Sequence, residues 1–359
     1  MPLKFVSGDS NSESALIKGD NLKVMNYLLE QKNLRGKIDM VYIDPPFSTN
    51  SVFRINKENT KTISSSLQDK VAYEDLLKGD EYLNFIKERL LLIRELMSDR
   101  SSIYVHIDYK IGHYVKILMD KVFGKDHFIN DITRIKCNPK NFERKAFGNI
   151  KDMILFYSKT DDYIWNEERI PFSEDEIKIL FKKIDKNGRR YTTIPLHAPG
   201  ETQNGITGGL WKGIKPPKGR HWRTDPKILE ELDKAGLIEW SKNGVPRKKI
   251  FADEVKGKKI QDVIEFKDPP NPSYPTEKNI DLLLLLIKMS SEKDSIILDS
   301  FCGSGTCLKA AQLLGRKFIG IDNSDEAIKV SLKRLESSLL NNFGFYEYYD
   351  ESEIYYTNS

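Results

Sequence analysis

The chain has 359 residues, of which 39% are hydrophobic and 31% are charged, and its net charge is +4. This length and mixture suit a soluble protein with one large domain and an elaboration. The longest apolar run, residues 282–287, is far too short to span a membrane, and the first residues lack the apolar core of a signal peptide. Three cysteines, at 137, 302 and 307, form no paired metal spacing, so we expect a metal-free protein in a reducing cytoplasm, with no membrane partner.

The charge is unevenly distributed along the chain. Residues 134–260 carry 28 Lys and Arg against 18 Asp and Glu, a net charge of +10, whereas the remainder carries 29 against 35, a net charge of −6. A basic middle segment in an acidic chain indicates a polyanionic partner. A lysine-rich solvated surface is the alternative.

The first 45 residues predict a βαβ unit. Residues 1–13 are polar, and we expect them to be loosely ordered. A strand over residues 15–20 ends in an acid, Asp20, which could cap the helix predicted over residues 21–30. The chain then returns to a second parallel strand through a right-handed crossover.

That second strand ends in the stretch around which we interpret the chain. Residues 38–50 read IDMVYIDPPFSTN, and the apolar run stops at Asp44-Pro45-Pro46-Phe47, because two prolines cannot donate to a strand ladder. The carboxyl end of a parallel strand is where open α/β sheets bind ligands. Asp44 and the prolyl carbonyls are acceptors and Phe47 is a flat apolar ring, which suits an aromatic amine. Taken alone, these residues could equally form an ordinary strand-ending turn.

The following segments continue the α/β pattern. Residues 48–79 are polar and predict a lid over a substrate. Helices are predicted over residues 80–97 and 111–122, and strands over residues 103–107, 129–135 and 153–157. His106 lies inside an apolar strand, so we expect a packed histidine rather than a base. The loop over residues 137–142 could contact nucleic acid.

Residues 160–270 break the α/β pattern with Gly, Pro, Trp and basic residues. One helix is predicted over residues 224–235, with Thr224 as its N-cap, and a basic cluster follows at residues 245–250. Trp211 and Trp222 suit the core of a small domain as well as they suit DNA contact.

A Gly-rich unit follows near the C-terminal end. Residues 296–306, IILDSFCGSGT, and residues 317–322, KFIGID, predict a strand, a glycine turn, a helix and a strand that ends in an acid. Gly303 and Gly305 allow positive φ and close approach of a ligand to exposed amides. Asp322 is suited to hydrogen-bond ribose hydroxyls.

Together, the Asp-Pro-Pro-Phe stretch and the Gly-rich unit resemble the S-adenosylmethionine-dependent amino-methyltransferases of DNA. The motif order is similar to that of the circularly permuted β class, and the resemblance covers most of residues 14–160 and 270–335. It implies a doubly wound, mostly parallel, seven-stranded Rossmann-like sheet with an inserted DNA-recognition domain. The implied domains are a catalytic half (1–159), a target-recognition domain (160–270), a cofactor-binding half (271–340) and an acidic, tyrosine-rich tail (341–359).

The resemblance also implies site residues. The catalytic residues are Asp44, Pro45, Pro46 and Phe47, and the cofactor-binding residues are Asp20, Thr276, Lys278, Asp299, Phe301, Gly303, Gly305 and Asp322. The DNA-binding candidates are Trp211, Arg220, His221, Trp222, Arg223, Arg247 and Lys248. Three positions depart from the family pattern: Glu277 stands for Gln, Asn279 for Pro and Ser300 for Pro.

The function that follows is methyl transfer from S-adenosylmethionine to adenine N6 in double-stranded DNA, with base flipping. Asp44 and the Pro45 carbonyl would accept the two amine N–H bonds, and Phe47 would stack on the base. The alternatives are cytosine N4 methylation, an RNA or protein-glutamine methyltransferase, and a non-catalytic DNA-binding module on the same fold. A homodimer, a cognate restriction endonuclease and the role of the tail stay open.

Overall fold

The computed structural model describes residues 2–46, 72–139, 141, 143, 145–202, 204–270, 272, 274, 277–337 and 342–349, without the side chains of residues 72–79. The chain forms two compact units. The larger unit combines Met1–Glu168 with Gln261–Ser359, and the smaller unit is Arg169–Ile260.

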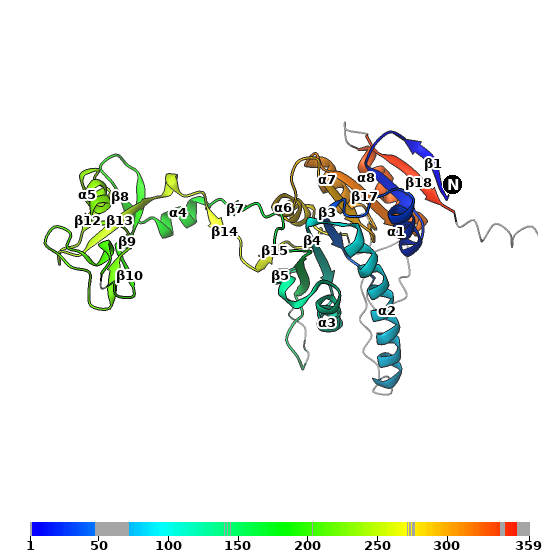
Figure 1. The fold of residues 1–359 in the computed structure, drawn as a ribbon, viewed down its shortest axis with the longest axis horizontal. Helices are drawn as coiled ribbons and strands as arrows, with labels where there is room; N and C mark the ends of the chain where they lie inside the picture. Colours follow the sequence, from blue (N-terminus) through cyan, green and yellow to red (C-terminus); the bar gives the residue numbers. More distant parts are fainter. Residues whose placement is uncertain are drawn as a thin grey trace, which may run out of the picture. The chain divides into compact units, whose positions relative to one another are not determined.

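The larger unit contains seven helices and ten strands within its described residues, drawn in Figure 1. The helices are α1 (Asn21–Glu30), α2 (Ala72–Leu96), α3 (Gly112–Phe123), η1 (Lys125–His127), α6 (Ile280–Ser290), α7 (Thr306–Leu313) and α8 (Asp325–Glu336). The strands of its sheet are β1 (Leu3–Gly8), β2 (Ala15–Lys18), β3 (Ile38–Ile43), β4 (Met97–Ile107), β5 (Phe128–Ile135), β6 (Lys151–Ser158), β15 (Val263–Glu265), β16 (Ile296–Asp299), β17 (Lys317–Asp322) and β18 (Gly344–Tyr348).

The order of that sheet is β1-β18-β2-β17-β16-β3-β4-β6-β5-β15. The run from β2 to β5 is the seven-stranded sheet that the sequence predicts, and within it only β6 is antiparallel to its neighbours. β2 and β3 belong to the predicted βαβ unit, but β16 and β17 from the far end of the chain lie between them. The Gly-rich unit therefore completes the sheet at its centre, as a permuted motif order requires.

One expectation about the chain ends is wrong, and the role of the tail, which the sequence left open, includes a strand. Residues 3–8 form β1 instead of a loose segment, because β1 pairs antiparallel with β18 of the C-terminal tail. β18 in turn pairs parallel with β2. These pairings join residues more than 300 positions apart, so no local pattern in the sequence could indicate them.

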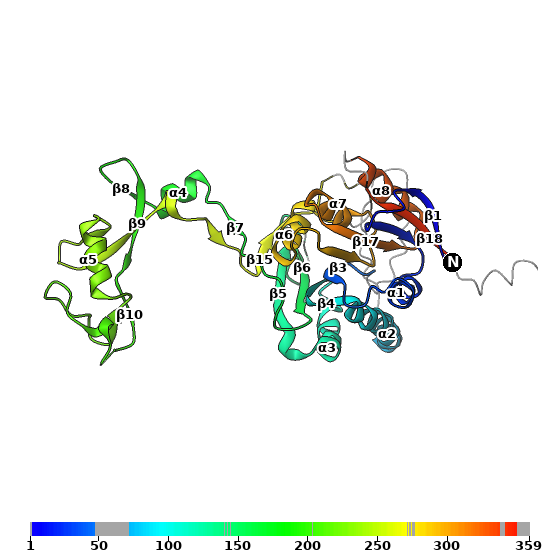
Figure 2. The ribbon, with the colours of Figure 1, turned by 45° about the horizontal axis from the view of Figure 1, so that its top comes forward.

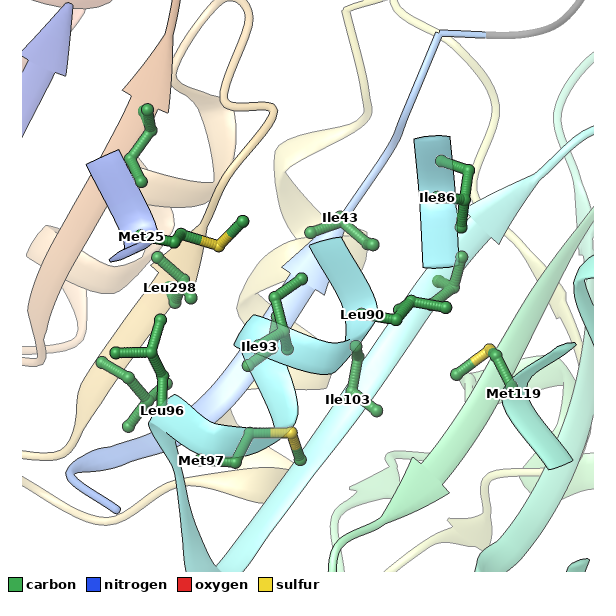
Figure 3. Packing of buried hydrophobic residues seen from close by; sticks show 14 of the residues in the cluster. Met25, Ile43, Ile86, Leu90, Ile93, Leu96, Met97, Ile103, Met119 and Leu298 are labelled. Atoms are coloured by element: carbon green, nitrogen blue, oxygen red, sulfur yellow. The ribbon is translucent and has the colours of Figure 1, made fainter. Parts of the chain in front are cut away.

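Helices cover both faces of the sheet. α1, α2 and α3 lie on one face, and α6, α7 and α8 lie on the other (Figure 2). On the first face, Leu90 and Ile93 of α2 pack beside Ile43 of β3 and Ile103 of β4 (Figure 3), and all four are 1% exposed or less. α2 begins at Ala72, earlier than predicted, and the rest of the predicted lid lies outside the described residues. No helix in the described part of the chain is long and apolar enough to cross a membrane.

The smaller unit is built from short strands and two α-helices. Its helices are α4 (Glu174–Leu180), η2 (Ile206–Gly208), α5 (Pro226–Lys234) and η3 (Ala252–Glu254), and its strands are β7 (Arg169–Ile170), β8 (Lys183–Ile184), β9 (Arg190–Pro195), β10 (His197–Pro199), β11 (Arg220–Trp222), β12 (Ile238–Trp240), β13 (Pro246–Phe251) and β14 (Lys258–Lys259). An antiparallel sheet has the order β12-β13-β9-β8. The N-cap of α5 is Asp225 and not Thr224, because the Asp225 carboxylate accepts the Lys227 N–H (2.8 Å) while Pro226 occupies the first turn.

Candidate active site

Four acids meet at one edge of the large sheet. Asp20 follows β2, Asp44 follows β3, Asp299 ends β16 and Asp322 ends β17. These four strands are parallel, so their carboxyl ends lie at the same edge. All four acids line one cavity of about 430 Å³.

Asp44 presents one oxygen without a partner. Its Oδ2 atom forms an ion pair with Lys278, whereas its Oδ1 atom is buried and has no hydrogen-bond partner among the described residues. Pro45 beside it is buried and Pro46 is exposed, and both line the cavity, whereas Phe47 lies outside the described residues. A buried acceptor without a donor is costly unless a ligand supplies the donor.

The Gly-rich turn is held by its own hydrogen bonds. The amides of Phe301 and Gly303 donate to the carboxylates of Asp299 and Asp322 (3.1 and 2.9 Å), and the Cys302 amide donates to the Ile321 carbonyl (3.1 Å). The sequence predicts amides exposed to a ligand here, but these three amides are bonded within the protein. The turn therefore acts as a shaped wall of the cavity.

The two glycines have different reasons to be glycine. Gly303 and Gly305 have φ of +49° and +70°, where a side chain is strained. A Cβ on Gly305 would lie 2.6 Å from the Ser331 hydroxyl oxygen of α8, so Gly305 permits helix packing and not ligand approach. A Cβ on Gly303 would meet only the Tyr274 ring and the Phe301 carbonyl, at 3.7 and 3.9 Å.

Asp299 is the most deeply buried of the four acids. Burial raises the pKa of its carboxyl well above the ordinary value, and the nearby Asp44 and Asp322 add to this rise against the opposing hydrogen bond from Phe301. A cation placed in the cavity would favour the ionised form of Asp299.

One end of the cavity joins α1 and α2. Asp20 caps α1, as predicted, by accepting the Lys23 amide (3.0 Å), and it also lines the cavity. Arg89 of α2 donates to the Asn21 side-chain oxygen (2.6 Å) and lies over the Phe85 ring (3.5 Å). Burial lowers the pKa of Arg89. Phe85 also approaches Phe301, with ring centroids 6.1 Å apart.

The cavity suits S-adenosylmethionine. Its lining includes five acids (Asp20, Asp44, Asp299, Asp322 and Glu326) against two bases (Arg89 and Lys278). Such an excess favours a ligand that carries sulfonium and ammonium charges. Ser300 lines the cavity, and its hydroxyl is buried without a partner among the described residues. The aromatic rings of Phe85 and Phe301 provide an apolar surface for a purine.

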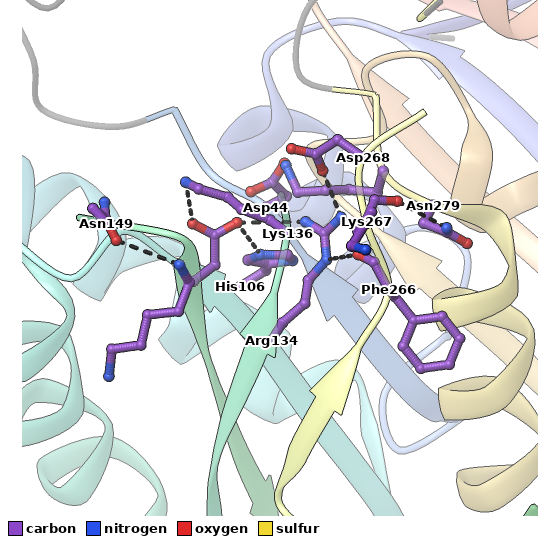
Figure 4. Close-up of polar contacts among 12 residues, drawn as sticks. Asp44, His106, Arg134, Lys136, Asn149, Phe266, Lys267, Asp268 and Asn279 are labelled. Atoms are coloured by element: carbon purple, nitrogen blue, oxygen red, sulfur yellow. Dashed lines mark hydrogen bonds and ion pairs between the residues drawn. The ribbon is translucent and has the colours of Figure 1, made fainter. Parts of the chain in front are cut away.

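His106 lies in a buried polar network beneath this edge. It is fully buried, as expected of a packed histidine, and burial lowers its pKa. In its neutral form it accepts the Tyr42 hydroxyl at Nδ1 (2.8 Å) and donates from Nε2 to Asp152 (3.2 Å). Asp152 also binds Arg134 and Lys136, and Figure 4 shows this network. Burial opposes ionisation of Asp152, but the His106 and Lys136 contacts win and lower its pKa.

The predicted cofactor residues are only partly placed. Asp20, Lys278, Asp299, Phe301, Gly303 and Asp322 line the cavity. Gly305 lies behind it, and Thr276 lies outside the described residues. Lys278, which the resemblance assigns to the cofactor, contacts Asp44.

The predicted DNA-binding residues lie in the smaller unit, and two of them are core residues. Trp211 and Trp222 are 3% and 1% exposed, pack edge-to-face with each other, and share a buried cluster with Leu196, Leu229 and Ile238. Their burial supports the alternative role in packing, because their large apolar rings belong to this small core.

The other five candidates are not buried: Arg220 and Arg223 are exposed, and His221, Arg247 and Lys248 are half-buried. Arg223 and Arg247 each donate to backbone carbonyls of β9, at Pro195 and Thr193 (3.1 and 2.7 Å). Arg220 contacts the His197 ring nitrogen (3.2 Å), and His221 contacts the Gly200 carbonyl (2.7 Å). Lys248 of β13 lies opposite Ile194 of the neighbouring strand β9, and it lines a small cavity together with Arg223.

Several site residues escaped prediction from the sequence. They are Tyr42, Phe85, Arg89, Tyr274 and Arg334. Only Arg89 had a local signal, since it lies beside the apolar positions 86, 90 and 93 of its helix, where a cation is unusual. The others depend on contacts between distant segments.

Comparisons with known proteins identify the family. The DNA methylase family (N6_N4_Mtase) matches residues 38–333. The type II methyltransferase M.EcaI of Enterobacter cloacae is 40% identical over 92% of this chain and 72% of its own length. The StyLTI Mod subunit, a type III restriction-modification enzyme of Salmonella typhimurium, is 26% identical over 86% of this chain and 51% of its own length.

Among solved structures, the PvuII DNA methyltransferase, described as cytosine-N4-specific, has a TM-score of 0.52 and 14% identity, covering 98% of this chain and 94% of that chain. This likeness concerns the fold alone. The family match spans both the Asp-Pro-Pro-Phe stretch and the Gly-rich unit. The chain thus belongs to the DNA methylase family and is a DNA methyltransferase that uses S-adenosylmethionine.

Proposed function

We propose that this methyltransferase modifies the N6 amine of adenine in double-stranded DNA, at a specific site and after base flipping. The observation that carries the proposal is the Oδ1 atom of Asp44, a buried acceptor in the cavity without a donor among the described residues. An amine N–H from a flipped base is the donor that this atom lacks.

The residues around Asp44 would make the amine reactive. An exocyclic amine is a weak nucleophile because its lone pair is delocalised into the ring. If Asp44 Oδ1 and the Pro45 carbonyl accept its two N–H bonds, the nitrogen becomes more pyramidal and its lone pair points out of the ring plane. S-adenosylmethionine, when bound, supplies the electrophilic methyl group. Phe47 would stack on the base, and Asp322 would accept from the ribose hydroxyls.

Cytosine N4 methylation is the competing function, since the same two acceptors suit that amine. The Asp at position 44 favours adenine, because the family resemblance implies that members with Asp at the first position of this motif lean to adenine and members with Ser lean to cytosine. The cytosine-specific structure named above shares the fold only and does not bear on the base.

One experiment tests the proposal directly. The chain is expressed in a host without DNA methyltransferases of its own, and the host DNA is read by single-molecule sequencing. We expect N6-methyladenine at one short sequence motif. N4-methylcytosine would establish the competing function, and unmodified DNA beside measurable binding of S-adenosylmethionine would support the non-catalytic module.

We further propose that the smaller unit recognises the DNA target. Arg223 and Arg247 are each held by a backbone carbonyl, which leaves other guanidinium N–H groups for DNA. Lys248 adds a flexible cation suited to phosphate. The relatives named as restriction-modification enzymes support a role beside a cognate endonuclease in the cytoplasm, and light scattering tests the proposed homodimer.

A further inference from the structure

Three consecutive residues connect three separate parts of the larger unit. Glu277 pairs with Arg334 of α8 (2.6 Å), Lys278 pairs with Asp44, and the Asn279 side-chain amide donates to the Lys267 carbonyl (2.9 Å). We call residues 277–279 the junction. They immediately precede α6, which Asn279 caps by accepting the Asp281 amide (2.8 Å).

Glu277 reaches the Gly-rich turn through Arg334. The Arg334 guanidinium uses Nη2 for Glu277 and Nη1 for the hydroxyls of Ser304 and Thr306. Glu277 and Arg334 side chains are each 16% exposed, so water screens the pair only weakly. The planar guanidinium thus fixes the distance between the junction and the wall of the cofactor cavity.

Lys278 acts on the catalytic carboxylate. Its side chain is 10% exposed, and its ammonium contacts Oδ2 of Asp44, whose side chain is 16% exposed. This contact restrains the rotation of the carboxylate and leaves Oδ1 for the target amine. Lys278 thus contacts the Asp-Pro-Pro-Phe stretch, although the family resemblance assigns it to cofactor binding.

Asn279 fastens the junction to a rigid base. Lys267, whose carbonyl accepts the Asn279 amide, lies between two residues that Arg134 holds: the Phe266 carbonyl (2.7 Å) and the Asp268 carboxylate. Arg134 is fully buried and also pairs with Asp152 of the polar network (Figure 4). The junction is therefore anchored in the same network that supports His106 and Tyr42.

We propose that the junction positions Asp44 relative to the cofactor cavity. Lys278 orients the carboxylate, and Glu277 sets the place of the Gly-rich turn through Arg334. Both are positioning residues. The inference rests on the proposed role of Asp44 as acceptor of the amine, and it adds that Lys278 serves the methyl-transfer step and not the binding of the cofactor.

The first test separates kcat from cofactor affinity. The full-length Lys278→Met and Lys278→Arg variants are compared with the wild type in methylation of unmethylated bacterial chromosomal DNA, and binding of S-adenosylmethionine is measured by calorimetry. We expect Lys278→Met to lower kcat about 100-fold, as a misplaced catalytic group does, with the Kd changed by less than about twofold. Lys278→Arg keeps the cation and should regain most of the loss. A Kd raised about tenfold with unchanged kcat would overturn the inference.

The second test is a double-mutant cycle on Glu277 and Arg334. If the two residues act as one arm, the effect of Glu277→Ala on kcat/KM should largely disappear when Arg334 is already Ala, a departure from multiplicative behaviour of about tenfold. Glu277→Gln keeps an acceptor for Arg334 and serves as the matched control if an alanine variant does not fold. If the effects on kcat/KM simply multiply, and Glu277→Gln and Glu277→Ala both behave like the wild type, the proposed role of Glu277 is wrong.

Asp44→Ala, which removes the acceptor, distinguishes failure of this inference from failure of the proposed function. If Asp44→Ala methylates DNA normally, the role of Asp44 is wrong and the proposed function loses the observation that carries it. If Asp44→Ala is inactive while Lys278→Met has wild-type kcat, the junction alone is refuted.

Discussion

At the scale of single residues, the two oxygens of Asp44 have different tasks. Oδ2 is neutralised by Lys278, while Oδ1 is buried without a partner among the described residues. The ion pair offsets part of the cost of burying the charge, and the unpartnered oxygen is the part of the site that a substrate must satisfy. A carboxylate so placed serves as an oriented acceptor.

The first prediction follows from this division. Asp44→Ala should lower the rate of methyl transfer at least about 100-fold, because the amine loses the acceptor that orients it. Removal of one oriented hydrogen-bonding group from an active site has an effect of this size. Binding of S-adenosylmethionine should stay close to wild type, since Asp299, Asp322 and the Gly-rich turn are untouched. Single-turnover methylation and calorimetry on the same preparation measure both quantities. A variant that methylates at the wild-type rate would contradict the assignment.

The second prediction concerns pH and Asp299. Its pKa is raised in the folded protein by burial first, so the protonated form is favoured there. The stability that this gives is fully present below the ordinary carboxyl pKa and is lost as the pH rises through the raised pKa of the folded state. Asp299→Asn has no such titration, so its free energy of unfolding should fall less than that of the wild type between about pH 5 and pH 9.

Urea unfolding of the ligand-free protein across this range measures the difference. The amide oxygen introduced by Asp299→Asn can still accept the Phe301 N–H, which makes it a matched control for packing. Parallel pH profiles for the wild type and the variant would show that the Asp299 carboxyl titrates alike in the folded and unfolded states.

The Gly-rich turn shows what a single residue can and cannot reveal. The need for glycine at position 305 was predicted, and its positive φ is confirmed, but a Cβ there would collide with Ser331 of α8 and not with a ligand. Helix packing and ligand approach would both require glycine at this position, so the sequence alone does not distinguish them. Only the packing of α7 against α8 distinguishes them.

At the scale of elements, α2 connects the catalytic half to the cofactor cavity. Its apolar side packs on β3 and β4, and its Arg89 side chain reaches Asn21, which donates in turn to the Ser300 carbonyl (2.7 Å). These two hydrogen bonds form a chain of contacts from Arg89 through Asn21 to Ser300, which links α2, α1 and the Gly-rich turn. Helix periodicity predicted the packing side of α2 but could not predict this chain, because its partners come from distant segments.

The third prediction tests that chain. Arg89→Met preserves much of the side-chain length but leaves the buried Asn21 oxygen without its donor, which should cost about 1–3 kcal/mol of folding free energy. Affinity for S-adenosylmethionine should fall as well, since Arg89 and Asn21 line the cavity. Urea unfolding and calorimetry measure the two effects. The surface variant Lys87→Met on the same helix is the control, and an equal effect of both substitutions would mean that helix propensity and not the chain is responsible.

The edge strands of the large sheet belong to the same scale. Apolar alternation and turn residues predicted the seven central strands, because each is a local pattern. β1, β18 and β15 were missed, since they are short and depend on partners that the sequence brings from far away. The motifs at the carboxyl ends of β3, β16 and β17 were visible, whereas the contacts that join these motifs, such as Lys278 with Asp44, were not.

At the scale of the whole molecule, charge is divided between two kinds of surface. The cofactor cavity is lined mainly by acids, while residues 134–260 carry a net charge of +10. An acidic pocket favours a cationic cofactor, and a basic segment favours a polyanion. This division follows from composition alone, but which cations contact DNA depends on how they are held.

The last prediction concerns these cations. Arg220→Ala and Arg223→Ala should weaken DNA binding without changing affinity for S-adenosylmethionine. Both residues belong to the smaller unit, whereas all residues that line the cofactor cavity belong to the larger unit. An arginine that reads a base should also relax the target motif, since one bidentate contact discriminates by about 1–3 kcal/mol. Lys248→Ala should instead weaken binding uniformly across sequences and make the slope of log affinity against log salt shallower by about one unit. The measurement is DNA affinity against salt for each variant, on the target duplex and on a scrambled one. Lys234→Ala, an exposed cation of α5, is the control, and wild-type curves for all three test variants would move DNA recognition to the loop of residues 138–150.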